Sequence, residues 1–296
     1  MDKNSRTAPS LLKGGLSPKR KLYGAVLKNA SRLCAAAVAL LAAAIVVFIV
    51  IKGSESLSWQ LVTSSPSILK KIDGILPNIL NTLYIILLSL LISLPLGVGA
   101  AIYLNEYARP GRLTAAVSFA AETLAGIPSI LYGLVGMLFF CQLLGLKSSL
   151  LAGALTLAVM ILPTLLRTAQ EALKTVPDSY REGAMALGAT RWAAVRTVVL
   201  PSCVDGILTG CILAVGRIIG ESAALLFTAG SAAVLMDSLY RTLTSSAGTL
   251  SVALYVEVAE RGRFDLGFAI ALVLLLLAAV INLAAKAVGK KCRARR

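Results

Sequence analysis

The sequence REGAMALGATRWAAVRTVVLP, residues 181–201, is a charged, amphipathic segment that lies between two long apolar stretches. It follows Val176-Pro177-Asp178, an order that favours a helix start, because proline presets the helical φ and an acidic residue follows in the first turn. Gly188 supplies a natural helix end. The segment therefore predicts a short helix over residues 179–187, a turn, and a second helix over residues 192–200 that leads into the next apolar stretch.

The composition on both sides of this segment is that of an integral membrane protein. The chain has 296 residues, of which 57% are hydrophobic and only 15% are charged, whereas soluble globular proteins are about 25% charged. Each of six apolar stretches is long enough to cross the roughly 30 Å hydrocarbon core of a bilayer. The predicted fold class is an all-α, polytopic membrane bundle of six transmembrane helices, at residues 33–51, 78–104, 113–141, 148–166, 202–229 and 265–287.

Lysine and arginine are distributed unevenly between the segments that flank these stretches. Of the 29 Lys and Arg residues, 21 lie at the two chain ends and in segments 105–112 and 167–200, 7 lie in the intervening segments, and Arg217 lies within a span. Because positive charge is retained on the cytoplasmic side, both termini are predicted to be cytoplasmic. We divide the chain into a basic cytoplasmic tail (1–32), a first transmembrane helix with an outer loop (33–77), a transmembrane domain (78–287) with the cytoplasmic loop 167–200, and a basic cytoplasmic C-terminus (288–296).

The residue types and motifs that are missing also narrow the function. The sequence has no histidine, and its five cysteines form no CxxC pair, so it predicts neither a metal site nor a Ser-His-Asp nucleophile. The net charge of +15 is not accompanied by a nucleic-acid-binding motif, which argues against a nucleic-acid partner. Without a GxxxxGK[ST] motif the chain is not expected to hydrolyse ATP. We expect a membrane-embedded chain with no catalytic residue, metal or cofactor of its own.

Small residues and prolines inside the spans predict how the helices pack. Gly206/Gly210 and Gly216/Gly220 are GxxxG spacings, which let helix backbones approach closely where lipid offers no hydrophobic drive for association. Proline lacks an amide N–H and clashes with the preceding turn, so it kinks or breaks a helix. We expect a kink or an interruption at Pro95, Pro128 and Pro163.

Two segments close to the predicted membrane surfaces carry less specific patterns. TLSVALYVEVAERGRF, residues 249–264, predicts an amphipathic helix that faces outward, either as a docking surface for a binding protein or as plain solvent-exposed surface. At the end of the second span, aromatic and charged residues are interpreted as interfacial anchors; they are Tyr103, Glu106, Tyr107 and Arg109.

Segment 181–201 resembles the motif that marks the permease subunits of ATP-binding-cassette (ABC) importers. That motif reads E-A-A, three residues, Gly, nine residues, I-x-L-P. The corresponding residues here are Glu182-Gly183-Ala184, Gly188 and Val198-Val199-Leu200-Pro201, with the same spacing, Gly183 in place of Ala and Val198 in place of Ile. The resemblance implies the fold of a type I ABC importer permease.

Three further stretches are similar to the PstA family of phosphate-importer permeases. They are LPLGVGAAIYLNEYA (94–108), AGIPSILYGLVG (125–136) and GRIIGESAALL (216–226), the last of which departs from the family pattern at Ala224, where proline is commoner. The resemblance implies import of inorganic phosphate across a bacterial plasma membrane. The alternatives are the sister permease of the same system, an importer permease for molybdate, sulfate or phosphonate, and an ion-driven secondary transporter, whose internal repeats are not evident in this sequence.

The resemblance also implies a set of partners. Permeases of this family pair with a second, homologous permease, with a dimer of ABC ATPase that binds ATP and Mg²⁺, and with an extracytoplasmic phosphate-binding protein. The helix over 182–188 would be the coupling helix, which sits in a groove of the ATPase and transmits its closure to the spans. The residues assigned to ATPase coupling are Arg181, Glu182, Gly183, Ala184, Leu187, Gly188, Leu200 and Pro201.

Three charged residues inside the predicted spans are candidates for the substrate path, namely Arg217, Glu221 and Glu122. A charge at the bilayer centre costs roughly 2.5–3.5 kcal/mol, so such residues usually face the protein interior. At i, i+4 spacing Arg217 and Glu221 would share one helix face. One interpretation is a structural ion pair. The other is that Arg217 holds phosphate through its guanidinium, that Glu221 keeps the anion from being trapped, and that Glu122 is a second partner.

Overall fold

The structure is a computed structural model that describes residues 18–67, 73–109, 111–234 and 238–294. It is helical, with no β-strand among these residues. The chain divides into two compact units, residues 1–51 and 52–296. The first unit consists, in its described part, of helix α1 (Pro18–Ser56), whose last residues belong to the second unit.

Helix α1 begins at Pro18 rather than at residue 33, where the sequence places the start of the first span. Residues 18–32, assigned to the basic tail by their charge, are therefore helical. Proline is favoured at a helix start, and the Lys, Arg, Leu and Ala residues that follow have high helix propensity. Residues 1–17 of the predicted tail lie outside the described residues.

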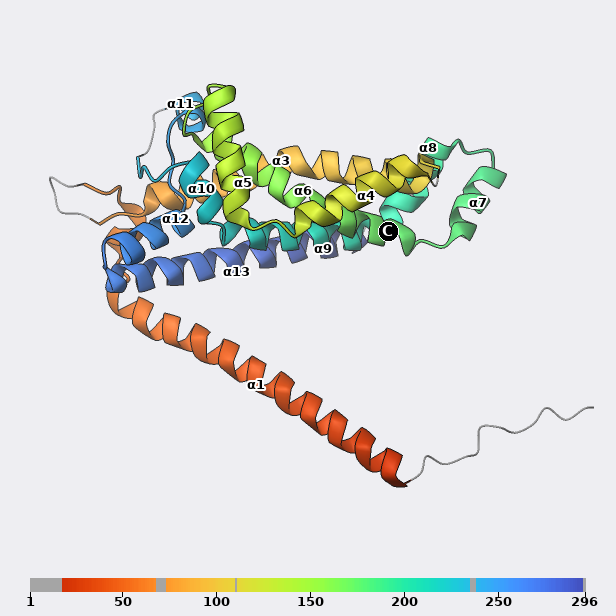
Figure 1. Ribbon diagram of the computed structural model, residues 1–296, viewed down its shortest axis with the longest axis horizontal. Helices are drawn as coiled ribbons and strands as arrows, with labels where there is room; N and C mark the ends of the chain where they lie inside the picture. Colours follow the sequence, from red (N-terminus) through yellow and green to blue (C-terminus); the bar gives the residue numbers. More distant parts are fainter. Residues whose placement is uncertain (1–17, 68–72, 110, 235–237, 295–296) are drawn as a thin grey trace, which may run out of the picture. The chain divides into compact units, whose positions relative to one another are not determined.

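The second unit contains the remaining helices, several of which continue directly into a π-helical turn (η). Figure 1 shows α7 and α8 at one end of this unit and α11 and α12 at the other. In chain order the elements are α2 (Trp59–Thr63), α3 (Leu76–Ile102), η1 (Tyr103–Tyr107), α4 (Arg112–Ala125), α5 (Ser129–Gly136), η2 (Met137–Leu143), α6 (Leu150–Lys174), α7 (Asp178–Ala186), α8 (Arg191–Ala194), η3 (Val195–Val199), α9 (Leu200–Ile219), α10 (Ala223–Thr228), α11 (Leu239–Thr244), α12 (Leu250–Tyr255), η4 (Val256–Glu260) and α13 (Phe264–Ala294).

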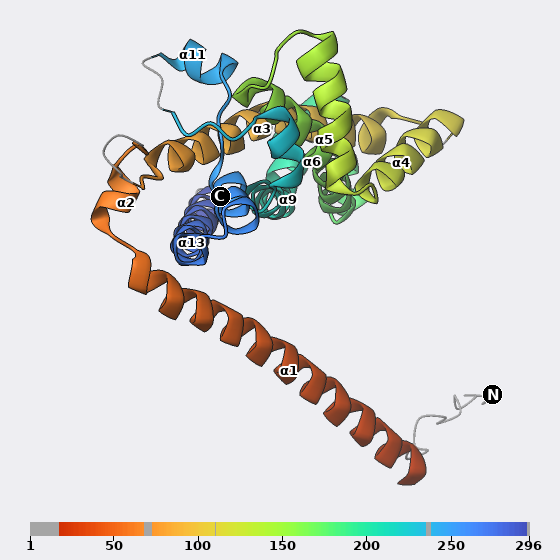
Figure 2. The same cartoon turned by 60° about the vertical axis from the view of Figure 1, so that its left-hand side comes forward.

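Helix α6 is the centre of the second unit. It makes its most extensive contacts with α3 and α9, and α13 runs beside α9 in both views (Figure 1, Figure 2). Its buried side chains Leu157, Met160, Ile161 and Leu165 form one cluster with Ile85, Ile218 and Leu225 from the neighbouring helices. Because α6 is covered on both sides, it is the rigid element to which the rest of the unit is attached.

Within the part of the chain that the structure describes, five helices are long and apolar enough to cross a membrane, and one bent pair of helices makes a sixth span if it is counted as one. The five are Leu22–Ser56, Leu76–Tyr107, Leu150–Lys174, Arg191–Ile219 and Phe264–Lys290. The bent pair, Arg112–Ala125 and Ser129–Leu143, meets at 103° and corresponds to the predicted third span, 113–141. Counted in this way, the prediction of six spans is confirmed, and the third span is broken between its two helices.

Of the three prolines inside the predicted spans, only Pro128 lies at a helix break. Pro128 lies at the break between α4 and α5, with extended backbone (φ −58°, ψ 138°) just before the first residue of α5. Proline also pushes the residue before it away from helical conformation, which accounts for the break. By contrast Pro95 and Pro163 lie within the continuous helices α3 and α6, so the expected interruption is absent there.

The fifth predicted span, 202–229, is two helices rather than one. Helix α9 ends at Ile219 and α10 begins at Ala223. At its other end α9 continues without interruption from α8 and η3, so that residues 191–219 form one long helix. The predicted second helix, 192–200, is the start of this helix. A wider π-helical turn directly before Pro201 relieves the clash of a proline ring with the preceding turn.

One of the two GxxxG spacings packs against another helix of this chain. A side chain at Gly206 would meet Ala172 of α6, and one at Gly210 would meet Thr168 of the same helix. At Gly216 an added Cβ would face open space. Close packing is therefore confirmed for Gly206/Gly210 and is not seen for Gly216/Gly220.

Candidate functional site

Helix α7 forms most of the connection between α6 and α8 and matches the predicted short helix closely. It begins after Pro177 and ends next to Gly188, which has a φ of +86°. Glycine adopts this left-handed conformation without the steric cost that other residues bear. The sequence therefore predicts the position of this helix correctly from proline and glycine alone.

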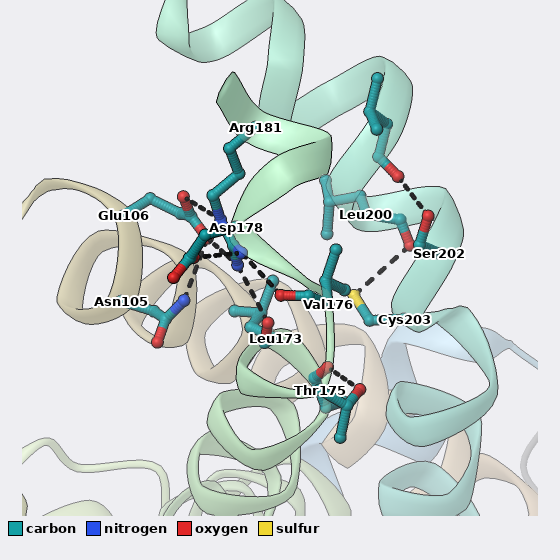
Figure 3. Close-up of polar contacts among 12 residues, drawn as sticks. Asn105, Glu106, Leu173, Thr175, Val176, Asp178, Arg181, Leu200, Ser202 and Cys203 are labelled. Atoms are coloured by element: carbon teal, nitrogen blue, oxygen red, sulfur yellow. Dashed lines mark hydrogen bonds and ion pairs between the residues drawn. The ribbon is translucent and has the colours of Figure 1, made fainter. Parts of the chain in front are cut away.

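Arg181 fastens α7 to the end of the second span (Figure 3). Its Nε lies 3.1 Å from both carboxylate oxygens of Glu106, and its Nη2 lies 2.9 Å from Glu106 Oε1. The side chains are well buried, with 16% exposed for Arg181 and 9% for Glu106. The planar guanidinium matches the two carboxylate oxygens in a way that a lysine cannot.

The same guanidinium also holds the end of α6. Nη2 donates to the carbonyl of Leu173 at 3.0 Å, and Nη1 donates to the carbonyl of Val176 at 2.8 Å and to Asp178 Oδ1 at 3.1 Å. The last carbonyls of a helix lack hydrogen-bond donors within the helix. Arg181 supplies a donor to one of them, the carbonyl of Leu173. It therefore joins η1, α6 and α7 into one rigid corner.

The environment of Arg181 favours its charged form. The hydrogen bond to Glu106 raises the pKa of the Arg181 guanidinium, and the opposing effect of burial is smaller. The corner consequently keeps the positive charge of Arg181. The sequence interpretation placed Glu106 among interfacial anchors and missed this pairing; the available signal was an acidic residue in a segment that otherwise carries the basic residues Arg109 and Arg112.

A groove of about 500 Å³ lies beneath α7 at this corner. Arg181 and Glu106 border it together with Lys174 and Arg191, and apolar side chains of α8 and η3 form its floor. The groove therefore lies between α7 and the start of the long helix 191–219, and Arg181 forms part of its border.

The outer surface of α7 carries most of the other residues assigned to coupling. Glu182, Gly183 and Gly188 are exposed, Ala184 is half-buried, and Leu187 has 91% of its surface exposed. An apolar side chain this exposed, next to exposed Tyr180 and Met185, is typical of a surface that binds a protein partner.

Leu200 and Pro201 lie apart from this surface, at the junction of η3 and α9. Leu200 is half-buried against a cluster that contains Val199 and Cys203. The predicted coupling residues thus fall into three groups. Arg181 is an internal anchor, the residues around Glu182 and Leu187 form an exposed surface, and Leu200 and Pro201 belong to the packed start of α9.

The three charged residues of the predicted substrate path do not form one cluster. Arg217 is half-buried on α9 and makes no ion pair with any residue that the structure describes. Its neighbours Ala214 and Ile218 on α9 lie in one buried cluster with Tyr132 of α5. The Tyr132 hydroxyl donates to the carbonyl of Leu124 at 2.7 Å and so bridges the break between α4 and α5. Arg217 therefore lies near the broken third span.

Glu221 and Glu122 each have a partner other than Arg217. Glu221 lies in the break after α9, so the expected shared helix face with Arg217 is lost; its Oε1 accepts from the N–H of Ala224 at 3.0 Å and caps α10. Glu122 pairs with Arg167 of α6 at 2.7 Å, with more than half of both side chains exposed. Gly220 lies in the turn that ends α9.

An ion-pair cluster that the sequence did not predict lies at the opposite end of the unit. Arg263, which precedes α13, pairs with both carboxylate oxygens of Asp73, before α3, and with Glu257 of η4. Arg261 pairs with Glu257 as well. These contacts fasten the connection between η4 and α13 to the start of α3.

Comparison with known proteins agrees with this architecture. Residues 93–294 match the family described as the inner membrane component of binding-protein-dependent transport systems. The chain is 39% identical over 211 residues to the probable ABC transporter permease protein YqgI of Bacillus subtilis, covering 71% of this chain and 72% of that protein. It is 33% identical over 239 residues to the phosphate transport system permease protein PstA 1 of Mycobacterium tuberculosis, covering 77% of each.

A phosphate transport system permease protein named PstC, from Haemophilus influenzae, is also 33% identical, over 271 residues, which cover 80% of this chain and 85% of that protein. Among solved structures, a chain of the bacterial alginate ABC transporter, in complex with a periplasmic protein that holds an alginate pentasaccharide, has the same fold, with a TM-score of 0.62 at 18% identity. The match covers 89% of this chain and 92% of that chain.

The chain belongs to the family of binding-protein-dependent transport system inner membrane components. It is a multi-pass membrane protein with the fold of an ABC importer permease. Within residues 18–67, 73–109, 111–234 and 238–294, no cluster of His, Cys, Asp or Glu is suited to hold a metal ion.

Proposed function

We propose that this chain is a permease subunit of an ATP-driven importer of inorganic phosphate in the bacterial plasma membrane. The observation that carries the proposal is Arg217, a half-buried arginine on a spanning helix whose guanidinium has no ion-pair partner among the described residues. A guanidinium can hold two oxygens of a phosphate at once. Relatives whose names specify phosphate transport support this choice of anion.

The separate partners of the two carboxylates favour a path over a structural pair. Glu221 is committed to α10 and Glu122 to Arg167, so neither carboxylate neutralises Arg217. A cation left without a partner inside a membrane protein is costly, and a transient anion would remove that cost. In this proposal Glu221, four residues after Arg217 in the chain, repels the anion enough for release, and Glu122 with Arg167 lies on the same path.

Coupling to ATP hydrolysis is assigned to α7. The exposed surface around Glu182 and Leu187 would bind an ABC ATPase dimer, which holds the ATP and Mg²⁺. Movement of α7 would pass through Arg181 to Glu106 and to the carbonyls at the end of α6, because this corner is fastened by buried charged hydrogen bonds. The α7 end of the unit and both termini would then be cytoplasmic, as the distribution of Lys and Arg indicates.

Two further partners complete the proposed importer. A second, homologous permease would cover the open surface of α4, on which every residue has some exposure, and an extracytoplasmic phosphate-binding protein would dock at the opposite end from α7. Assignment to the PstA type rather than to its sister permease rests on the motifs GESAALL (220–226) and AAIYLNEYA (100–108).

The test is uptake of labelled phosphate at low external concentration, in cells that lack this chain and in cells to which it is restored. We expect uptake to depend on the chain and to resist excess sulfate, molybdate and phosphonate. Competition by one of these anions would reassign the substrate, and uptake that does not depend on the chain would refute phosphate import.

A further inference from the structure

The break between α9 and α10 leaves backbone groups without helical partners. In a membrane such groups must find other hydrogen-bond partners within the protein, because the bilayer core offers no water. The carbonyl of Glu221 accepts a hydrogen bond of 2.6 Å from Ser251 Oγ, in the first turn of α12. Both residues are buried, at 8% and 6% exposure. Ser251 also lines, with Gly220 and Ser222, an open cavity of about 410 Å³ beside the break.

Ser251 is itself held by its neighbours at the start of α12. Its hydroxyl lies 3.0 Å from Thr249 Oγ1. The N–H of Leu250 donates at 2.9 Å to Oγ1 of Thr82, a residue of α3. Because Thr82 and Thr249 are each only 1% exposed, no water competes for these hydrogen bonds. The predicted outward-facing helix of residues 249–264 is therefore buried in its first turn.

The segment before α12 is fastened to α3 by two side-chain amides. Asn78 Nδ2 and Asn81 Nδ2 both donate to the carbonyl of Gly248, at 2.9 Å and 3.2 Å. Both asparagines are buried. A carbonyl held by two donors from one helix cannot move along that helix without losing both hydrogen bonds. The start of α12 therefore has a fixed position along the axis of α3.

The carboxylate of Glu221 has its own partner at the break. Oε1 accepts from the N–H of Ala224, in the first turn of α10, where a negative charge is favourable. The carboxylate thus points toward α10 and does not pair with Arg217, which lies one turn before the break.

We propose that Ser251 is a positioning residue of the transport path: it holds Glu221 in the turned conformation that leaves Arg217 available to the anion. The inference rests on the proposed function. Without the Ser251 hydroxyl the Glu221 carbonyl loses its donor, the break relaxes, and the carboxylate becomes free to neutralise Arg217.

The test compares Ser251→Ala with Ser93→Ala in the complete transporter, reconstituted in lipid vesicles. Ser93 is another buried serine, which donates at 2.6 Å to the carbonyl of Ser89 within α3, so it controls for the loss of a buried hydroxyl. The quantities measured are phosphate transported and ATP hydrolysed. For Ser251→Ala we expect transport to fall about tenfold, on the order of one lost buried hydrogen bond, with ATP hydrolysis little changed.

Ser93→Ala is expected to leave both rates unchanged, and Ser251→Thr, which keeps the hydroxyl, to retain most of the transport. If the ratio of phosphate transported to ATP hydrolysed is the same in Ser251→Ala as in the wild type, whether or not both rates fall, the positioning role is overturned. If the wild-type complex transports a different oxyanion, the proposed substrate is wrong, and the same ratio measured with that anion then decides the role of Ser251.

Discussion

At the scale of single residues, two arginines of this chain have opposite surroundings and opposite roles. Arg181 uses its guanidinium on the carboxylates of Glu106 and Asp178 and on backbone carbonyls at and just beyond the end of α6, so it is a fixed part of the scaffold. Arg217 makes no ion pair among the described residues and is therefore available to a ligand. The sequence predicts both as functional, but spacing alone does not show which one is already satisfied.

Replacing Glu106 by Gln is expected to loosen the corner that α7 forms with η1. The change leaves the buried Arg181 charge without its main partner, and removing one member of a buried ion pair costs roughly 3–5 kcal/mol. We expect trypsin to cleave between residues 178 and 191 at least about tenfold faster. Because the pKa of Arg181 is raised, the wild-type contact should stay intact up to strongly alkaline pH.

The control for this measurement is Arg191→Lys. Arg191 is exposed and donates a long hydrogen bond of 3.4 Å to the backbone carbonyl of Glu106, so its replacement is expected to leave cleavage elsewhere in the segment unchanged. Equal protection in Glu106→Gln and in the wild type would show that the ion pair does not hold α7.

Converting Arg217 to Gln is expected to reduce phosphate uptake to background, because the neutral amide cannot replace a guanidinium that binds two phosphate oxygens. The amount of the chain in the membrane and its copurification with the ATPase should not change. Arg196→Gln, an exposed arginine of η3, is the matched control and should transport normally. Normal uptake by the Arg217 variant would remove this residue from the path.

At the scale of elements, the interruptions of the helices matter most. The sequence predicts the break at Pro128 but equally one at Pro95 and Pro163, where packing in α3 and α6 keeps the helix continuous. It misses the break after α9, because residues 202–229 are apolar enough for one span. The signal that was present is Gly220 followed by Glu221, a helix end next to a residue that can cap the next helix.

Close packing of α9 on α6 depends on Gly206. A methyl group there would meet Ala172, a side chain too short to move aside, so the two helices would have to separate. Such overpacking lowers the free energy of unfolding by about 1–3 kcal/mol. We expect Gly206→Ala to lower the thermal unfolding midpoint of the protein in detergent. Gly99→Ala is the control, because nothing lies within 4 Å of the added carbon. A midpoint for Gly206→Ala as high as that of Gly99→Ala would contradict the close packing of α9 on α6.

At the scale of the whole molecule, the fold class follows from composition and hydrophobic length, and the α7 connection from the positions of proline and glycine. Contacts between distant segments do not follow from them. The pairs Arg181 with Glu106, Arg263 with Asp73, and Ser251 with Glu221 join residues 30 to 190 positions apart. No local pattern encodes such pairs, since each depends on how whole helices are placed.

The most direct test of phosphate import is transport by the purified complex in sealed lipid vesicles. With labelled phosphate and its binding protein on one side and Mg²⁺-ATP on the other, we expect phosphate to accumulate only while ATP is hydrolysed, and not with a non-hydrolysable analogue. Sulfate at the same concentration should not accumulate. Phosphate movement that follows an ion gradient without ATP, or accumulation of sulfate in its place, would contradict an ATP-driven phosphate importer.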